Sequence, residues 1–303
     1  MLTFAEIRDS VMALFDVIDD TGTDLTVTND AINRTHARRV DETNWRWNLS
    51  PRRTLLVVSG TQTYILPFDD ISRFHYFRDT TNKVFLSVVP GRSYEDQPFN
   101  EQTANDNIRL ALSGWSPVKA QPSSATTLTI TSTVAEDGAQ TLYIEGTDAD
   151  DNVVSESVLN NGTTTNSYER VTYVAKVGTW AGTLTLATTG GTTLLVLSAS
   201  QNAKQYPTIE FVNPPSETFT VEYRYFKRAR VLTRDNDIPD LPYPMSNILI
   251  YDALLELATY NELDSESVNI WREKQREWLD NMYLSTLEGN TVGGVTERIH
   301  EGF

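Results

Sequence analysis

Residues 235–260 read DNDIPDLPYPMSNILIYDALLELATY, and this stretch decides how the chain's most apolar helix enters the fold. Three prolines stand within six residues. Each fixes φ and so lowers the entropic cost of ordering the turn. Only three strongly polar residues interrupt the segment that follows, namely Asp252, Glu256 and Thr259. They form one narrow stripe, so the sequence predicts a rigid turn that delivers a buried helix against the N-terminal helix, with Ser246 as its N-cap.

Helical patterns occur near both ends of the chain. Thr3 and Glu6 have the spacing of a capping box, and apolar residues then recur at helical intervals. A second helix is predicted over residues 28–43. A long one is predicted over residues 265–288, with Gly289 just beyond its end.

Strand patterns fill most of the remaining sequence. Residues 54–67 are typical of a hairpin closed by Gly60 and stopped by Pro67. Between residues 125 and 202, 18 threonines accompany six short β-rich runs that are separated by turn-forming residues. Short strands at roughly ten-residue spacing indicate an immunoglobulin-like sandwich.

The predicted fold class is α+β, with a discontinuous domain organisation. Residues 1–114 and 206–303 are expected to form a body of N- and C-terminal helices with a small antiparallel sheet. Residues 115–205 are expected to form an inserted all-β immunoglobulin-like sandwich, because inserted domains survive where their ends meet at an exposed loop. Residues 289–303 have three glycines near their start and no packing pattern, which predicts a flexible C-terminal tail.

The net charge of −16 comes from 25 Lys and Arg against 41 Asp and Glu. Residues 235–303 alone carry 4 bases and 14 acids. This balance argues against tight nucleic-acid binding but suits a surface past which DNA slides without sticking. The absence of cysteine excludes disulfides, thiolate metal sites and cysteine nucleophiles. No apolar run is long enough for a membrane span and the N-terminus lacks a basic region, so we expect a soluble protein made in a host cytoplasm.

No residue constellation typical of catalysis is present, and we predict neither an enzyme nor a cofactor. The three histidines, which stand apart from one another, are His36, His75 and His300. One acidic loop could supply clustered oxygens to calcium through Asp148, Asp150 and Asp151. The same residues are typical of a polar hairpin turn, and this is the interpretation we prefer.

Basic and aromatic residues provide candidate interface positions. Adjacent arginines are either solvated or pair with the acidic surface of a neighbouring subunit, which the acidic C-terminal helix could supply. Tryptophans at a helix-to-strand corner either fill the core or anchor an interface. The candidates are Arg38, Arg39, Trp45, Trp47, Arg52 and Arg53, together with Arg298, Ile299 and Phe303 in the tail.

Several motifs occur in a recognisable order: GTQTYILP at residues 60–67, TVEYRYFKR at 220–228, DLP at 240–242, and two helices containing YDAL at 251–254 and WRE at 271–273. In this order the chain resembles the head-to-tail adaptor proteins of tailed bacteriophages, also called head-completion or connector proteins. The resemblance covers residues 1–114 and 206–303, about two thirds of the chain.

The resemblance implies a structural virion protein at the head–tail junction, the neck. Identical subunits would form a ring, twelve-fold in this family, that docks beneath the portal protein during viral assembly. The ring would receive the tail or nozzle protein and extend the channel through which DNA passes during ejection, without specific binding. The inserted sandwich would reach capsid or tail fibres.

An alternative places the function in the sandwich itself. The chain would then be a tail-fibre or attachment protein whose insert binds a receptor or glycan, with Tyr143, Tyr168 and Trp180 as candidate exposed aromatics. The more ordinary expectation is that these aromatics fill the sandwich core.

Overall fold

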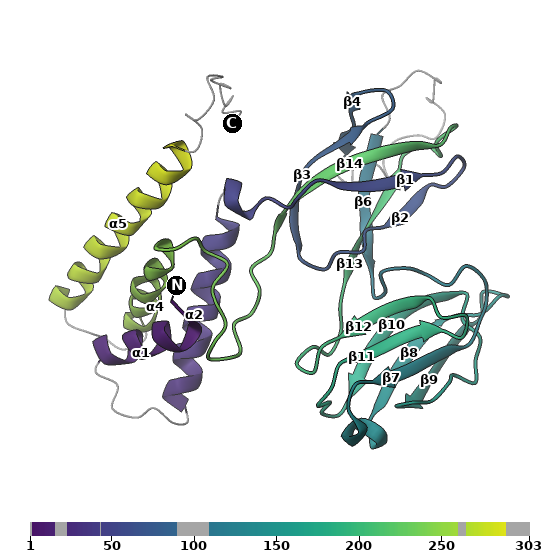
Figure 1. Ribbon diagram of the computed structural model, residues 1–303, viewed down its shortest axis with the longest axis horizontal. Coiled ribbons are helices and arrows are strands. Elements are labelled where there is room, and N and C mark those ends of the chain that lie inside the picture. The colour runs from purple at the N-terminus through teal and green to yellow at the C-terminus, as the bar shows by residue number, and fades with distance from the viewer. Residues whose placement is uncertain (1, 16–22, 43, 90–108, 260–264, 289–303) are drawn as a thin grey trace. The chain divides into compact units, whose positions relative to one another are not determined.

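The computed structural model describes residues 2–15, 23–42, 44–89, 109–259 and 265–288. Over these ranges the fold mixes four α-helices with several largely antiparallel sheets, as the α+β prediction requires (Figure 1). The chain divides into two compact units. The first contains Met1–Pro51, Ser72–His75 and Arg224–Phe303, and the second contains Arg52–Ile71 and Tyr76–Tyr223.

All four described helices lie in the first unit. They are α1 (Phe4–Leu14), α2 (Thr23–Asp41), α4 (Ile248–Ala258) and α5 (Ser265–Glu288), with short 3₁₀ turns at Arg46–Asn48 and Met245–Asn247. The prediction for α5 is confirmed. The predicted start of α2 was wrong, because the helix begins five residues earlier. No glycine or proline follows Gly22 before residue 28, so nothing stops the helix from extending toward its N-terminus.

The capping box of α1 is confirmed. Thr3 Oγ1 accepts a hydrogen bond from the Glu6 amide (3.3 Å), and the Thr3 amide donates to Glu6 Oε2 (2.8 Å). The next two amides of the helix donate to the carbonyls of residues 237 and 235, at 2.7 and 3.1 Å. The acidic segment before the prolines therefore satisfies the otherwise unpaired amides at the start of the chain's first helix.

The proline-rich turn is bonded to the loop that follows β14 (Phe219–Lys227) and to the 3₁₀ turn that precedes α4. The Arg230 amide donates to Asp240 Oδ2 (3.0 Å), and the Met245 amide donates to the Pro242 carbonyl (2.7 Å). The Tyr243–Pro244 peptide bond is cis. The N-cap prediction for Ser246 was wrong, because this residue is buried in a 3₁₀ turn that runs directly into α4. The i→i+3 bonds of that turn take over the role of a side-chain cap.

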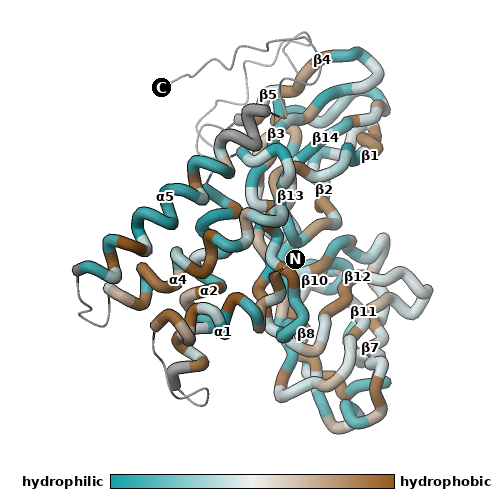
Figure 2. The backbone as a smooth tube through the Cα atoms, turned by 60° about the vertical axis from the view of Figure 1, so that its left-hand side comes forward, coloured by the Kyte–Doolittle hydropathy of each residue, from teal (hydrophilic) through white to brown (hydrophobic). Residues whose placement is uncertain are grey.

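Helix α4 provides the centre of the first unit's core, and Figure 2 shows it as predominantly hydrophobic. It contacts α1, α2 and α5. Its buried apolar residues are Ile248, Leu249, Ile250, Ala253, Leu254 and Leu257. Those contributed by the other helices are Phe4, Ile7 and Val11 of α1, Ala31, Ile32 and Val40 of α2, and Trp271 and Met282 of α5.

The polar stripe of α4 is directed at the arginines of α2. Asp252 is fully buried, and both of its carboxylate oxygens accept hydrogen bonds from Arg39, each at 2.6 Å. Gln275 of α5 donates a third bond to the same carboxylate (2.5 Å). One turn further along α4, Glu256 pairs with Arg34 (2.5 Å). Burial opposes the charged form of Arg39, but the bonds and charge of Asp252 outweigh it and raise the pKa of the guanidinium above its usual value.

Two four-stranded sheets belong largely to the second unit. Their orders are β1-β14-β3-β4 and β2-β13-β6-β5. The strands are β1 (Arg53–Val57), β2 (Thr63–Ile65), β3 (Ile71–Asp79), β4 (Val84–Phe85), β5 (Ser87–Val89), β6 (Arg109–Ser116), β13 (Tyr206–Phe211) and β14 (Phe219–Lys227). Part of β3 and the end of β14 belong to the first unit.

The hairpin predicted at Gly60 was wrong. Strand β1 pairs with β14 and strand β2 pairs with β13, so the two predicted arms enter different sheets. The partner of β1 is β14, which has nine residues, and the partner of β2 is β13, which has six. Each partner is longer than the other arm of the predicted hairpin. Gly60 retains a turn role at φ +80°, where its amide donates to the Pro215 carbonyl (2.8 Å).

All six β-rich runs between residues 125 and 202 are strands. They are β7 (Leu128–Ser132), β8 (Thr141–Thr147), β9 (Val153–Leu159), β10 (Arg170–Val177), β11 (Leu184–Thr188) and β12 (Thr193–Leu197). They form two three-stranded antiparallel sheets, β10-β8-β9 and β12-β11-β7, whose inward residues share one hydrophobic core. The preceding strand β6 pairs with the following strand β13, with Ser116 opposite Tyr206. The segment thus leaves and returns at neighbouring strand ends, the arrangement that a domain insertion requires.

Replacing Asp252 with alanine should strongly destabilise the first unit. The change leaves the buried Arg39 charge without its partner, which costs about 3–5 kcal/mol. Denaturant unfolding followed by the helical circular dichroism signal measures this, since the described helices all lie in that unit. The matched control is Glu256→Gln, whose partner Arg34 is about half exposed. It should cost no more than about 1 kcal/mol, and equal losses in the two variants would contradict the central role of Asp252.

Candidate functional site

The two candidate tryptophans stack on each other beside the end of α2. Their ring centroids lie 5.9 Å apart. Trp45 is only 1% exposed, and its indole nitrogen donates to the Arg39 carbonyl (2.7 Å). The ring of Tyr283 from α5 lies 5.4 Å away. Trp47 is half-buried, and its indole nitrogen has no hydrogen-bond partner among the described residues. Trp45 therefore belongs to the core, whereas Trp47 lies between the core and the surface.

The candidate arginines have very different surroundings. Arg39 is buried against Asp252, as described above. Arg38 is about half exposed, with its nearest carboxylate, Asp252, at 3.8 Å. In the second unit, the Arg52 side chain is 72% exposed and lies 3.8 Å from Glu222. Arg53 stacks its guanidinium over the Phe68 ring at 4.5 Å. Of these four, Arg38 and Arg52 are the cations most accessible to a partner.

The candidates in the C-terminal segment, Arg298, Ile299 and Phe303, lie outside the described residues, as does His300. Among the described histidines, His75 packs edge-on against Phe226 with ring centroids 5.6 Å apart. His36 is completely buried in α2, where its Nε2 accepts a hydrogen bond from the Asp240 amide (2.9 Å). Burial lowers the pKa of both histidines below the ordinary value of 6.5. His36 thus joins α2 to the proline-rich turn.

The acidic loop considered for calcium is a tight turn between β8 and β9. Asp148 Oδ1 accepts hydrogen bonds from the amides of Asp150 and Asn152, both at 2.9 Å. The Asn152 side-chain amide also donates to Asp148 Oδ2 (3.2 Å), and this bond together with the two backbone bonds lowers the pKa of the Asp148 carboxyl. Asp151 adopts a φ of +60° within the turn. Within the described part of the chain, no group of three or more acidic or histidine side chains is placed to hold a metal ion.

The aromatic residues considered for glycan binding divide into two groups. Tyr168 and Trp180 are buried in the core that β7–β12 share, at 0% and 3% exposure, so they are not available to a ligand. Tyr143 of β8 alternates with the inward residues Leu142 and Ile144 and is half-buried. Its ring lies edge-on to the half-exposed Tyr173 of β10, with centroids 6.0 Å apart.

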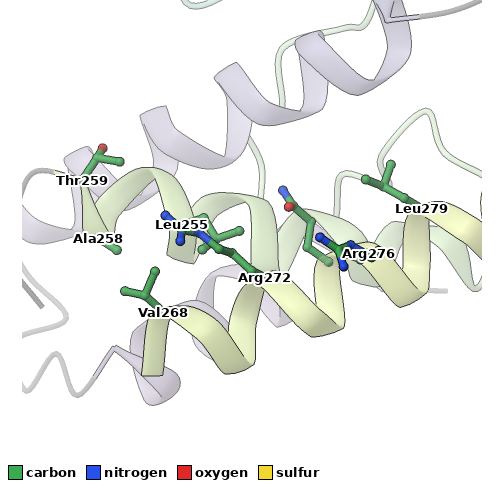
Figure 3. Close-up of a pocket in the computed structure, with 8 residues that line it drawn as sticks. Leu255, Ala258, Thr259, Val268, Arg272, Arg276 and Leu279 are labelled. Atoms are coloured by element: carbon green, nitrogen blue, oxygen red, sulfur yellow. The ribbon is translucent and has the colours of Figure 1, made fainter. Parts of the chain in front are cut away.

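A groove of about 480 Å³ runs between α4 and α5 (Figure 3). Its lining residues are Leu255, Ala258 and Thr259 of α4 and Val268, Arg272, Gln275, Arg276 and Leu279 of α5. Gln275 is fixed in the groove by its bond to the buried Asp252. The Arg272 side chain extends from α5 toward Leu255 (Figure 3). Arg272 and Arg276 are both exposed, and neither makes a hydrogen bond or ion pair within the part of the chain that the structure describes.

The groove was missed at the sequence level, although a signal exists. Residues 235–303 contain only four basic residues, and two of them stand four positions apart on α5. That spacing places both on one face of a helix. Finding the groove from this signal would also require the packing angle of α4 against α5, which periodicity does not supply.

No protein-family model matches the chain, and no curated protein matches it. Among the described helices, none combines the length and the apolar character needed to cross a bilayer. The arrangement is therefore interpreted from its own geometry: a helical core with an open, arginine-bearing groove, a half-buried tryptophan and two exposed arginines.

Stability should depend on His36 in a defined pH window. Because the folded-state pKa is lowered, the neutral ring is favoured on folding, and this contribution is present above the unfolded pKa. It is lost as the pH falls through the folded pKa, and it is absent in a variant without the imidazole. The charges facing the ring are the carboxylate of Asp240 and the guanidinium of Arg230. Between about pH 7.5 and pH 5 the unfolding free energy should fall less steeply in His36→Gln than in the natural chain. His75 is present in both proteins, so its contribution to the pH dependence cancels in the comparison. Identical slopes would contradict the assignment.

Proposed function

We propose that this chain is a structural subunit of the neck of a tailed phage: a head-to-tail adaptor that assembles into a ring between the portal and the tail or nozzle. The observation that carries the proposal is that the two ends of the chain form one unit. Residues 1–51 and 224–303 meet around α4, and three of the motifs that carry the resemblance to adaptors, DLP, YDAL and WRE, lie in the second of these segments.

The finer architecture follows from the same proposal. The first unit is the helical body of the subunit, and residues 115–205 are an inserted immunoglobulin-like sandwich. Two three-stranded sheets with a shared core, entered and left through the paired strands β6 and β13, support this assignment. In the assembled ring the insert would be available to capsid or tail fibres.

A ring of identical subunits needs two different complementary surfaces on each copy. Arg38 on the first unit and Arg52 on the second each offer an accessible cation to a neighbouring subunit. Exposed carboxylates on α5, such as Glu273, Glu277 and Asp280, provide the complementary surface. Charge complementarity of this kind steers assembly and fixes its register. The net charge of −16 supports a channel through which DNA passes without being retained.

The direct test combines the purified chain with the portal protein encoded in the same genome. Electron microscopy should show a ring on the portal, with the twelve-fold symmetry of the resembling family. A chain that neither binds the portal nor forms a ring with it, while remaining folded by circular dichroism, would overturn the proposal.

The interface residues are tested by charge reversal. Arg38→Glu and Arg52→Glu should each weaken ring assembly while leaving unfolding nearly unchanged, since exposed charges contribute little to stability. Sedimentation velocity of the portal–chain mixture measures the assembled fraction. Arg170→Glu, an exposed reversal on β10, is the matched control. Equal effects of all three changes would show that net charge alone, and not these positions, controls assembly.

The second candidate function is glycan or receptor binding by the insert, and the Tyr143–Tyr173 pair on the outer side of the β10-β8-β9 sheet favours it. Partly exposed aromatic rings offer a flat apolar surface with a polar rim. Binding of the full chain to host cells should then fall in Tyr173→Ala and persist in Tyr243→Ala, where another exposed tyrosine is removed from the first unit. If Tyr173→Ala binds host cells as well as Tyr243→Ala does, the Tyr143–Tyr173 face is not the binding surface.

A further inference from the structure

The α4–α5 groove has the chemistry of a peptide-binding surface. Its walls are apolar at both ends, with Ala258 and Val268 at one end and Leu279 at the other (Figure 3). Between these ends Gln275 lines the groove, and its side chain is fixed by a hydrogen bond to the buried Asp252. A groove that is fixed in this way does not need to reorganise before binding, which lowers the cost of filling it.

The two arginines specify the charge of the occupant. Arg272 and Arg276 lie one helical turn apart and line the groove. No carboxylate among the described residues pairs with either of them, although the first unit is rich in acids. By contrast, Lys274, which stands between them in sequence but does not line the groove, is paired with Glu277 at 2.9 Å. The groove therefore presents two free guanidinium groups beside apolar walls, a match for a segment that alternates carboxylates with apolar residues.

Residues 295–303, VTERIHEGF, have this composition. Its two glutamates are Glu297 and Glu301. The apolar residues Val295, Ile299 and Phe303 alternate with them. The two basic residues of the segment are Arg298 and His300.

The chain length also fits. From the end of α5 at residue 288 back to Arg276 is 12 residues, or roughly 18 Å along a helix. Residues 289–294, GNTVGG, number six and can span up to about 20 Å. Three of them are glycines, which adopt the backbone conformations of a reversal without steric penalty. Residue 295 can therefore reach the groove of its own chain, and the residues after it can follow the groove toward Val268.

We propose that residues 295–303 bind the α4–α5 groove of the same chain, with Glu297 paired to Arg276, Glu301 paired to Arg272, and apolar side chains against the groove walls. Tethering gives the segment an effective concentration of the order of millimolar, so its own copy outcompetes a second chain in dilute solution. The contact would cover the two accessible cations of the groove. The inference does not depend on the adaptor assignment.

The absence of cysteine permits a direct test in the full-length chain. Thr259→Cys lies on the exposed rim of the groove, and Ile299→Cys lies in the segment. Under mild oxidation this pair should form a disulfide within one chain at least about ten times faster than the control pair, because both pairs share the tether and only the first is held together by binding in the groove. The control pair joins Ile299→Cys to Lys274→Cys, which stands outside the groove on the same helix. Non-reducing electrophoresis and intact mass give the rate and separate monomer from dimer.

Charge reversal then tests the pairing itself. Adding Arg272→Glu and Arg276→Glu to the Thr259–Ile299 pair should reduce the oxidation rate to that of the control pair, whereas adding Lys274→Glu should leave it unchanged. Circular dichroism confirms that each variant is folded before its rate is compared. Equal rates in both cysteine pairs, disulfides formed between two chains, or indifference to the arginine reversal would each overturn the proposal.

Discussion

The buried ion pair between Arg39 and Asp252 is the constraint on which the first unit depends. A carboxylate removed from water must have its oxygens satisfied, or burial costs several kcal/mol. Here Arg39 of α2 supplies two hydrogen bonds and Gln275 of α5 supplies a third. Helices α2 and α5 must therefore each keep a fixed rotation and a fixed axial position relative to α4. Apolar packing alone tolerates small shifts, whereas a three-way bonded carboxylate does not.

The need to place Asp252 opposite Arg39 also explains why the loop between β14 and α4 is fixed by prolines and hydrogen bonds. The loop after β14 is bonded to α1 through the carbonyls of residues 235 and 237, and to α2 through His36. Prolines restrict the unfolded chain at this point, so less entropy is lost when the loop is fixed. The turn positions Asp252 opposite Arg39 only if both attachments hold. Segments separated by about 200 residues are thus joined by backbone bonds, by ion pairs such as Arg39–Asp252 and Arg34–Glu256, and by one apolar core.

Much of this fold is predictable from local patterns, and the failures have a common cause. The capping box of α1, the bounds of α5 and the six strands between residues 125 and 202 depend on neighbouring residues, and the sequence patterns identified them. The hairpin at Gly60 failed because strand pairing is decided by partners far along the chain. The polar stripe on α4 was visible, but its orientation toward α2 depends on tertiary packing. The groove was missed for the same reason, since it exists only where two helices separate.

Arginines that lack a carboxylate partner among the described residues point to a candidate binding site more clearly than any single sequence motif does. In the first unit, Arg34, Arg39 and Lys274 each have a carboxylate partner within hydrogen-bonding distance. Arg272 and Arg276 do not, although acids outnumber bases more than threefold in residues 235–303. Arginines placed at arbitrary positions on so acidic a surface would be expected to find carboxylate partners. Arg272 and Arg276 line an apolar-walled groove and have no carboxylate partner among the described residues. A candidate binding surface is thus recognised, within the described residues, by charges that the fold itself does not pair.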